Sequence, residues 1–503
     1  RRICRNESGE SAVCVLNSVF PMNRSRGKTE FLKESFVFFI RRVEIRVILW
    51  HITDSRKVNR SIKKERIVKF IGDKIAIGDI PVEQLAARFG TPLYVYDEQK
   101  IRRNYRKVYN AFSKYYPDFK MFYAVKACNN PAIVNILRQE GAGVDAASVN
   151  EILLAKYVGL GGENVMFSGN FLSDDDIRQG LASGVIFNLD DISILPRLLK
   201  FGKPEMLSFR VNPGYGKSNV GEYVTNAGPN AKFGIHPDKV LDAYRMAKEA
   251  GVKRFGAHMM TGSCITDAEY FPFVTGLLMD IIGKTAKTLG IDFEFIDLGG
   301  GLGIGYKPDE PALDLDKAAS LTADMFRKKC QEYGMKPPQL KMEPARYFVG
   351  NAGWIIGRVH SIKDSYKRIV GTDIGMNTLA RPAMYGSYHH IYVDGKENMP
   401  RKAIGLCGQL CENTDFWVKE RQLPENIAEG DLVVVENAGA YGFGMSYQYN
   451  GRLRPAEVLV NGAVVGVTDE NGELVITATA SMEGNTSFLI AARKGELVSF
   501  TTS

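Results

Sequence analysis

Met121-Phe-Tyr-Ala-Val-Lys-Ala127 is the stretch of sequence that points most clearly to a fold. Its first five residues form an apolar run that predicts a short, buried β-strand, and Lys126 stands where this strand should end. Because burial disfavours a charged amine, we expect the pKa of Lys126 to be lowered and its nitrogen to act as a nucleophile. Amines of this kind form Schiff bases with carbonyl compounds. A surface lysine whose alkyl chain crosses apolar side chains would give the same pattern.

Short apolar strands alternate with amphipathic helices from about residue 96 to residue 349. The predicted strands are 121–126, 143–147, 164–168, 185–189, 206–212, 254–260, 293–298 and 340–343. The predicted helices are 131–140, 149–158, 174–183, 192–201, 238–250, 268–289 and 315–333. Gly or Pro stands at most junctions, and about eight strands linked by helices is the count of a (β/α)8 barrel. A doubly wound open sheet fits less well, because the dinucleotide fingerprint is missing after the first strand.

Beyond about residue 350 the chain becomes rich in β-forming segments. Asp394-Gly395, Asn461-Gly462 and Asn471-Gly472 are typical of tight turns between antiparallel strands. The predicted strands are 355–362, 368–372, 390–393, 432–436, 456–460, 463–467, 473–476 and 496–501. We therefore expect an α/β protein, with a (β/α)8 TIM-type barrel over residues 96–349 and a C-terminal antiparallel β domain over residues 350–503. Residues 67–95, with a strand over 69–77, are expected to join the β domain.

The charge of the chain is concentrated at its N-terminal end. Residues 1–66 carry 16 Lys and Arg against 7 Asp and Glu, whereas the whole chain has a net charge of +8. The remaining residues are therefore close to neutral, and we expect no binding to nucleic acid. Residues 1–66 are expected to be a basic extension that is disordered or non-native. Their acidic residues fit an organellar transit peptide poorly, although that alternative would place the protein in a plastid.

The cysteine content and the hydropathy of the chain indicate where in the cell the protein is expected. Seven cysteines without a CxxC pair argue against a disulfide framework and a structural zinc site, so we expect no metal. No run approaches the roughly 18 apolar residues of a membrane span. The nearest, 36–52, is interrupted by four charged residues. A cytoplasmic protein that does not bind membranes is the expectation.

Two loops at the predicted barrel mouth carry groups suited to a phosphorylated ligand. In barrel enzymes a phosphate site often follows strands seven and eight. Strand seven ends in Ile296-Asp-Leu-Gly-Gly-Gly-Leu-Gly303, whose glycines let backbone N–H groups approach a phosphate. Strand eight ends in Met342-Glu-Pro-Ala-Arg346, where Arg346 can donate to an anion. Glu343 could keep a pyridine nitrogen protonated, so that the ring acts as an electron sink. A simple turn and a structural ion pair are the respective alternatives.

Taken together, these segments resemble a known family. The alanine-racemase-like-barrel decarboxylases that use pyridoxal phosphate have motifs similar to Tyr123-Ala-Val-Lys-Ala127, Gly143-Val-Asp-Ala-Ala-Ser148, Gly299-Gly-Gly301, Glu343-Pro-Ala-Arg346, Cys411-Glu412 and Ala438-Gly-Ala-Tyr441. The diaminopimelate decarboxylase family in particular is resembled by Asp373-Ile-Gly-Met-Asn377, Arg381-Pro-Ala-Met-Tyr-Gly386 and Arg454-Pro-Ala-Glu457. The resemblance covers about residues 70–495, and several motifs in order are more specific than any one of them.

The resemblance implies a role for each matching residue. Pyridoxal 5'-phosphate would be held by Lys126, through a Schiff base, and by Asp145, Ser263, Gly300, Gly301, Glu343, Arg346 and Tyr441. The amino-acid substrate would contact Arg346, Arg381, Tyr385, Glu412 and Tyr441, with Glu412 on the distal amino group. Cys411 would be the second catalytic residue, donating a proton to the carbanion that loss of CO2 leaves. An inert buried thiol is the alternative for Cys411. The family places Cys411 and Glu412 across a homodimer interface, so that each completes the partner's site.

Besides Asn413, where the family often has serine, two positions depart from the family pattern. Met260 stands where a second histidine usually stacks on the pyridine ring, and His258 should point to the same face as Met260. Ala345 replaces the usual glycine before Arg346, which is tolerable only if the backbone there avoids positive φ. A catalytically silent, cofactor-binding homologue is therefore one alternative, favoured by Met260 alone.

The expected function is decarboxylation of meso-2,6-diaminopimelate to L-lysine and CO2, the last step of lysine biosynthesis. A decarboxylase of another basic amino acid or of a carboxylated polyamine (ornithine, arginine or carboxynorspermidine) is the other alternative. Such an enzyme would need an acidic distal pocket. Glu412 permits it, but Arg381 argues against it.

Overall fold

The computed structural model describes residues 3–5, 11–13, 68–220, 225–462 and four short strands between 464 and 501. The chain divides into two compact units, Arg1–Arg56 and Lys57–Ser503. In the first unit only β1 (Ile3–Arg5) and β2 (Ser11–Val13), an antiparallel pair, are described. The rest of the predicted basic extension, 1–66, and the predicted Asn471-Gly472 turn lie outside the described residues.

Eight parallel strands close into a barrel in the order β10-β11-β13-β15-β16-β7-β8-β9. Every strand predicted between 121 and 343 overlaps one of these eight, so the prediction of a (β/α)8 barrel is confirmed. The strands are β7 (Phe119–Ala124), β8 (Gly143–Ala146), β9 (Val165–Phe167), β10 (Ile186–Leu189), β11 (Met206–Arg210), β13 (Arg254–His258), β15 (Phe293–Asp297) and β16 (Gln339–Met342).

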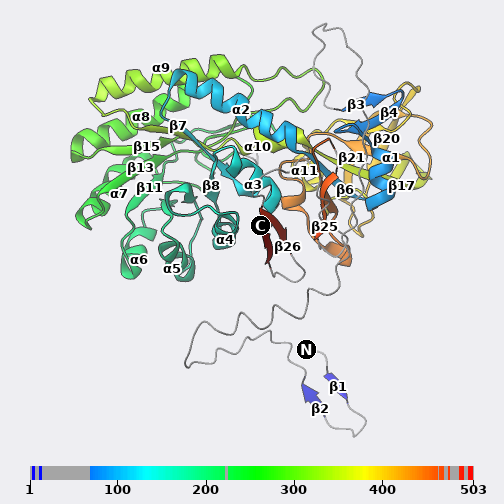
Figure 1. Cartoon of the computed structure of the whole chain (residues 1–503), viewed down its shortest axis with the longest axis horizontal. Helices are drawn as coiled ribbons and strands as arrows, with labels where there is room; N and C mark the ends of the chain where they lie inside the picture. The colour runs from blue at the N-terminus through cyan, green and yellow to red at the C-terminus, as the bar shows by residue number, and fades with distance from the viewer. Residues whose placement is uncertain are drawn as a thin grey trace. The chain divides into compact units, whose positions relative to one another are not determined.

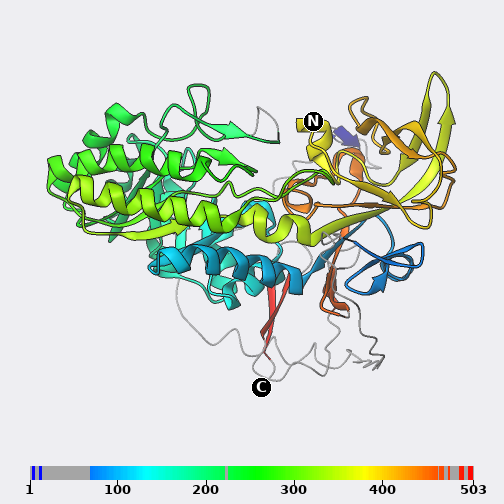
Figure 2. The ribbon, with the colours of Figure 1, turned by 90° about the horizontal axis from the view of Figure 1, so that it is seen from above.

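Helices surround this ring of strands (Figure 1). They are α2 (Glu98–Tyr115), α3 (Pro131–Gln139), α4 (Val149–Tyr157), α5 (Asp174–Ser183), α6 (Ile194–Phe201), α7 (Pro237–Glu249), α8 (Tyr270–Leu289), α9 (Leu315–Tyr333) and the short α10 (Ala345–Val349). Figure 2 shows the two longest helices of this set, α8 and α9, running side by side. No helix in the described part of the chain is long and apolar enough to cross a membrane.

Local sequence determines where these helices begin and end. Ser173 and Asp176 form a capping box at the start of α5, in which each side chain accepts a hydrogen bond from the other residue's backbone N–H. Helices α8 and α9 both end at glycines, Gly290 and Gly334, whose φ angles of +59° and +64° are left-handed. These signals explain why the predicted ends of α5 and α9 agree with the structure.

The interior of the barrel has an apolar layer beneath a polar one. Lys341 and Glu343 are two residues apart, as are Phe295 and Asp297, so the members of each pair point to the same side of their strand. The Lys341 ammonium lies 3.7 Å from the centroid of the Phe295 ring. The apolar layer consists of Phe122, Met166, Ile186, Met206 and Phe295. Lys341 is thus a charged residue that packs on this apolar layer, whereas Asp297 and Glu343 lie at the C-terminal ends of their strands, where barrel enzymes place their active sites.

A ten-stranded sheet combines β6, which precedes the barrel in the chain, with strands that follow it. Its order is β21-β20-β18-β17-β6-β23-β24-β25, with β22 pairing to β17 and β19. Its strands are β6 (Leu93–Asp97), β17 (Gly353–Asp364), β18 (Arg368–Thr372), β19 (Ile391–Val393), β20 (Arg401–Cys407), β21 (Phe416–Pro424), β22 (Leu432–Val435), β23 (Ala456–Val460), β24 (Val464–Thr468) and β25 (Leu474–Val475). Most pairs are antiparallel, as predicted, but β18–β20 and β6–β23 are parallel. Three of these strands, β6, β20 and β21, were not predicted. A separate antiparallel pair, β26 (Ser487–Ala491) and β27 (Leu497–Thr501), includes the strand predicted at 496–501.

The segment before β6 is a small sheet and not the single strand predicted over 69–77. The chain turns at Gly72, where φ is +68°, and forms an antiparallel hairpin of β3 (Lys69–Ile71) and β4 (Lys74–Ile77). Strand β5 (Ile80–Pro81) adds to β4, and α1 (Val82–Phe89) follows. Ile75 packs with Trp354 and Val458 of the large sheet. The segment is therefore part of the β-rich region, although it contains a turn that the apolar pattern concealed.

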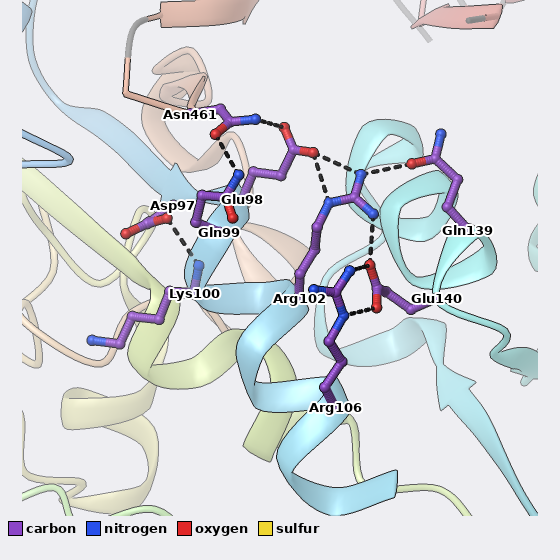
Figure 3. Close-up of polar contacts among 9 residues, drawn as sticks. All are labelled: Asp97, Glu98, Gln99, Lys100, Arg102, Arg106, Gln139, Glu140 and Asn461. Carbon is purple, nitrogen blue, oxygen red and sulfur yellow. Dashed lines mark hydrogen bonds and ion pairs between the residues drawn. The ribbon is translucent and has the colours of Figure 1, made fainter. Parts of the chain in front are cut away.

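Polar contacts at the start of α2 link the large sheet to the barrel (Figure 3). Asp97 caps the helix by accepting a hydrogen bond from the Lys100 backbone N–H at 2.9 Å. The carboxylate of Glu98 pairs with Arg102 at 2.6 Å and accepts from Asn461, just beyond β23, at 3.2 Å. Arg102 also pairs with Glu140 at the end of α3. The first turn of α2 is thus held from both sides.

Candidate active site

A cavity of about 270 Å³ opens at the C-terminal ends of the barrel strands. Side chains from the barrel and from the large sheet line it together. Ten of the predicted site residues are in its wall: Lys126, Asp145, Ser263, Gly300, Gly301, Glu343, Arg346, Arg381, Tyr385 and Tyr441. Residues that are up to 315 positions apart in the chain, such as Lys126 and Tyr441, are thereby brought into one pocket.

Lys126 lies in a short 3-10 turn, η2 (Val125–Ala127), directly after β7. Its Nζ is 3.3 Å from Oδ2 of Asp145, and 44% of its side-chain surface is exposed to the pocket that it lines. Burial by the surrounding protein lowers the pKa of Lys126, but the carboxylates of Asp145 and Glu343 raise this pKa by more than burial lowers it. The net pKa lies above the ordinary value, so the prediction of a lowered pKa is wrong. The sequence did not show that two acids would face the amine.

Three buried titratable side chains meet beneath the pocket. Nε2 of His258 is 3.4 Å from Oε1 of Glu343, but neither atom has a partner at hydrogen-bonding geometry. Asp297 accepts a hydrogen bond from the Gly299 backbone N–H at 2.8 Å through Oδ1, while its Oδ2 has no partner. Buried polar atoms are normally paired, so these open positions indicate a site built for a ligand.

The charges around Glu343 favour a positively charged N–H group as that ligand. Burial raises the pKa of Glu343, but His258, Lys126 and Arg210 lower it to below its ordinary value. Glu343 therefore lines the pocket as an ionised carboxylate whose Oε1 makes no well-aligned hydrogen bond, which fits the protonated nitrogen of a pyridine ring. His258, Asp297 and Glu343 also offer ligand atoms within 4.8 Å of one another, as a metal site would. The nearby cations Lys126 and Arg210 make a divalent ion unfavourable there.

Two glycines in the loop after β15 occupy positions where a side chain would be strained or would clash. Gly301 has a φ angle of +101°, and a Cβ on Gly300 would lie 2.5 Å from the Glu343 carbonyl oxygen. The adjoining wall supplies Ser263 and Arg346, whose side chains are 3.4 Å apart. Backbone N–H groups, a hydroxyl and a guanidinium around an open cradle are suited to a phosphate.

The two departures from the family pattern have structural outcomes. Met260 lines the pocket, and its sulfur accepts a hydrogen bond from the Gly300 backbone N–H at 3.1 Å. Met260 therefore supports the glycine loop in addition to offering a polarizable face to the cavity. Ala345 begins α10 without a positive φ angle, so its methyl group causes no backbone strain.

Tyr441, Arg346 and Arg381 form the wall on the side of the large sheet. Tyr441 has a φ angle of +57°, and its N–H donates to the Ala127 carbonyl at 2.7 Å, so the loop after β22 is tied to the turn that carries Lys126. The Arg346 guanidinium lies 4.6 Å from the centroid of the Tyr441 ring. Arg381 and Tyr385 come from the short helix α11 (Ala380–Tyr385), and Arg381 is only 1% exposed.

Two predicted residues, Cys411 and Glu412, do not line this pocket. Both are exposed in the loop between β20 and β21. The Cys411 backbone N–H donates to Asn450 at 2.7 Å, and Glu412 accepts from the backbone and hydroxyl of Thr414, which lowers the pKa of Glu412. A role for this pair in a second subunit's site stays a prediction.

Arg210 is a pocket residue that the sequence reasoning missed. It ends β11, lines the cavity, donates to the Asn226 carbonyl at 3.1 Å and packs 4.3 Å from the Phe233 ring centroid. Burial lowers the pKa of Arg210, while Asp190 opposes this effect. A lone cation at the end of an apolar strand is the same signal that singled out Lys126. Asn170, Lys232 and Phe233 also line the pocket, but they lie in loops that carry no comparable signal.

Comparisons with known proteins give a consistent result. The family model for "Pyridoxal-dependent decarboxylase, pyridoxal binding domain" matches residues 98–350. The chain is 45% identical to the diaminopimelate decarboxylase of Methanothermobacter thermautotrophicus, over 80% of this chain and 94% of that protein. It is 37% identical to the diaminopimelate decarboxylase of Archaeoglobus fulgidus, over 80% and 96%. The solved structure of the diaminopimelate decarboxylase from M. jannaschii with L-lysine is similar at a TM-score of 0.73 and 32% identity, over 79% of this chain and 93% of that one.

Proposed function

The chain belongs to the diaminopimelate decarboxylase family, and we propose that it converts meso-2,6-diaminopimelate to L-lysine and CO2, the last step of lysine biosynthesis. It is a carboxy-lyase that uses pyridoxal 5'-phosphate. The observation that carries the proposal is the combination of groups in one pocket: an amine at Lys126, an ionised carboxylate at Glu343 and a guanidinium nitrogen without a hydrogen-bond partner on Arg381.

The residues present fit the cofactor. We assign Lys126 to its carbonyl carbon and Glu343 to its pyridine nitrogen, since Glu343 lines the pocket as an ionised carboxylate that can accept from an N–H donor. Ser263, the loop at Gly300 and Gly301, and Tyr441 are assigned to its phosphate, together with Arg346. When bound, pyridoxal phosphate withdraws electrons from the carbon that loses CO2. The protein's part is to hold that carbon in place and to control protons around it.

Asp145 is assigned to proton exchange with Lys126. A raised pKa keeps Lys126 charged, and a charged amine cannot attack a carbonyl carbon. Asp145 lies 3.3 Å away, and burial together with Glu343 raises its own pKa. It is therefore a stronger base than a surface aspartate, and is placed to accept the lysine proton. Glu343, with its lowered pKa, remains ionised, so a pyridine nitrogen bound to it would keep its own proton.

Arg381 supports diaminopimelate over substrates without a second carboxylate. Its side chain is buried in the pocket wall, and Nη2 has no hydrogen-bond partner. Meso-2,6-diaminopimelate has a carboxylate remote from the reacting carbon, whereas ornithine and arginine do not. A guanidinium binds a carboxylate well, and a cationic distal group would be repelled by it. We assign Tyr385 and Arg346 to the same end of the substrate.

A homodimer is a further part of the proposal. Cys411 and Glu412 are exposed and lie outside the pocket of their own chain. In the proposed dimer Cys411 donates the final proton, and Glu412 binds the distal amino group in the partner's site. A cytoplasmic location is also proposed, supported by an odd number of cysteines without a CxxC pair.

The test is release of CO2 and L-lysine from meso-2,6-diaminopimelate by purified protein with pyridoxal phosphate. We expect both products in equal amounts from the natural chain and neither from Lys126→Ala. Cofactor binding without any turnover would contradict the proposal and would instead support a catalytically silent homologue. Retention of full activity by Lys126→Ala would overturn the assignment of the amine.

A further inference from the structure

Two arginines are buried in the pocket wall without an acidic partner among the described residues. Arg346 is 7% exposed and Arg381 is 1% exposed, and the charged groups that act on Arg381 include Arg346 itself. Like charges removed from water are unfavourable unless an anion joins them. The side chains around the two guanidiniums must therefore hold them in place when no anion is bound.

Tyr306 bridges the two arginines. It lies in the loop after β15, a few residues beyond the glycine cradle, and is 5% exposed. Nη1 of Arg346 donates to the Tyr306 hydroxyl oxygen at 2.6 Å, and Nη1 of Arg381 donates to the same oxygen at 3.0 Å. The Tyr306 ring also lies under the Arg381 guanidinium, 4.8 Å from centroid to carbon. One phenol thus fixes the distance between the two cations.

His389 holds Arg381 from the other side. Its Nε2 is 2.9 Å from Nη1 of Arg381, and its Nδ1 is 2.9 Å from the carbonyl oxygen of Glu436. An arginine can only donate, so Nε2 accepts, and Nδ1 must carry the hydrogen that is donated to Glu436. Burial and the charge of Arg381 lower the pKa of His389 well below its ordinary value, which keeps this neutral form.

The hydrogen bonds of Arg381 leave one end of its guanidinium available. Nη1 has two hydrogens, and Tyr306 and His389 accept both of them. Nη2 has no partner, although Arg381 lines the cavity. An arginine at the cavity wall, with one nitrogen fixed and the other without a partner, is organised in advance for one end of a carboxylate.

We propose that Tyr306 and His389 are positioning residues that hold Arg381 at the cavity wall with its Nη2 unpartnered, and so make the site specific for substrates with a carboxylate remote from the reacting carbon. This inference rests on the proposed function and deepens it. Neither residue needs to touch the substrate, since each acts through Arg381. Their loss should weaken binding of the remote carboxylate and leave the chemistry at the reacting carbon largely unchanged.

The test compares two ligands that differ in that carboxylate. L-lysine with its ε-amine at the reacting end has a remote carboxylate, and cadaverine does not. The holoenzyme is titrated with each, and binding is followed through the absorbance of the bound cofactor, which does not require turnover. For His389→Leu we expect binding of L-lysine to weaken by about 10-fold to 100-fold, the usual effect of losing a hydrogen bond to a charged group, and binding of cadaverine to change less than about twofold. In the same variant, KM for diaminopimelate should rise by a factor similar to that of the L-lysine dissociation constant, while kcat stays within about threefold of the natural value.

Two sets of variants separate positioning from folding. His389→Gln keeps one acceptor and one donor and should recover most of the L-lysine binding. His390→Leu, which removes a neighbouring histidine that contacts Tyr388 and not the arginines, should leave the ratio of the two affinities unchanged. Tyr306→Phe should lower L-lysine binding more than His389→Leu does, because both arginines lose their acceptor. Tyr347→Phe is the control, since Tyr347 packs against the same apolar cluster as Tyr306, and it should leave L-lysine binding unchanged.

Equal weakening of L-lysine and cadaverine binding in His389→Leu would overturn the inference. So would a variant that binds less cofactor but whose remaining holoenzyme has unchanged affinities for both ligands. Failure of the natural chain to turn over diaminopimelate is a different result. It would contradict the proposed function, while a preference for L-lysine over cadaverine that disappears in His389→Leu would still support the positioning of Arg381.

Discussion

Lys126 Nζ and Asp145 Oδ2 lie 3.3 Å apart inside the pocket, and this contact reverses the effect that burial alone would have on the amine. Burial disfavours the charged lysine, but the adjacent carboxylates favour it more strongly. The free enzyme therefore holds a protonated lysine beside a base and not a neutral amine. The proton must leave before the amine can bind a carbonyl carbon.

Asp145→Asn should change the pH at which the enzyme captures its cofactor. The Asp145 carboxylate raises the pKa of Lys126, so its removal lowers that pKa, and the neutral amine becomes available at lower pH. We expect the midpoint of capture rate against pH to move to lower pH in the variant. We also expect kcat/KM at neutral pH to fall by about 100-fold, because a proton acceptor is lost.

The measurement is the rate at which apoenzyme gains the visible absorbance of bound pyridoxal phosphate, recorded across a pH series. Asp191→Asn, on the exposed turn after β10, is a matched control that should leave the profile unchanged. A midpoint that stays in place or moves to higher pH in Asp145→Asn would show that Asp145 does not set the charge of the lysine.

Gly300→Ala should weaken cofactor binding by at least about tenfold. A Cβ at this position would lie 2.5 Å from the Glu343 carbonyl oxygen, so the loop must shift away from the phosphate cradle. Equilibrium titration with pyridoxal phosphate measures the effect. Gly161→Ala is the control, because a Cβ there meets no atom within 4 Å and its φ of −164° suits any residue. Equal affinities in both variants would contradict the assignment of the glycine loop to the phosphate.

Mixed dimers test the proposed role of Cys411. If each site takes Lys126 from one chain and Cys411 from the other, Lys126→Ala and Cys411→Ala homodimers are both inactive. Random mixing then makes half of the dimers mixed, each with one intact site, and restores about one quarter of the natural activity. Activity is assayed after the two variants are dissociated and reassociated together. No recovery, with dimers present by light scattering, would contradict a shared site.

Glu457 should make the stability of the fold fall as pH rises. It is 6% exposed, accepts hydrogen bonds from Tyr96 at 2.8 Å and Asn130 at 3.0 Å, and burial raises its pKa to about 7. The folded state therefore holds a proton that the unfolded state releases near about pH 4.3, which reduces the free energy of unfolding between these two pH values by about 4 kcal/mol. Above pH 7 the loss is complete.

Denaturant unfolding at pH 5 and pH 7.5 measures this difference. Glu457→Gln cannot titrate, so its free energy of unfolding should decrease less than that of the natural chain over the same interval. Glu425→Gln, at an exposed position beyond β21, is the control and should behave like the natural chain. Identical pH slopes for Glu457→Gln and the natural chain would show that Glu457 ionises normally in the fold.

Regular periodicity made much of the fold predictable, and loops and mixed sequences account for the rest. The barrel strands are short apolar runs separated by clear helices, so their order was readable. Strands β20 and β21 were missed because charged residues such as Lys402, Lys419 and Glu420 interrupt them on exposed faces. The hairpin at 69–77 was hidden because Gly72 and Asp73 are a short break in an otherwise apolar pattern.

The site could be predicted where a motif has a local signature. Lys126 and Glu343 end apolar strands, and the glycine loop follows another, so their positions at the barrel mouth follow from the barrel itself. Tyr306 and His389 lie in irregular segments on different domains, and nothing in the sequence shows that both contact Arg381. The sign of the Lys126 pKa shift likewise depends on which carboxylates meet in space.

The most direct measurement offers the enzyme equal concentrations of meso-2,6-diaminopimelate, L-ornithine and L-arginine, and identifies which compound loses CO2. We predict that L-lysine is the dominant product and that its formation is lost in Lys126→Ala. Preferential formation of putrescine or agmatine would contradict the proposed function and the assignment of Arg381 to a remote carboxylate.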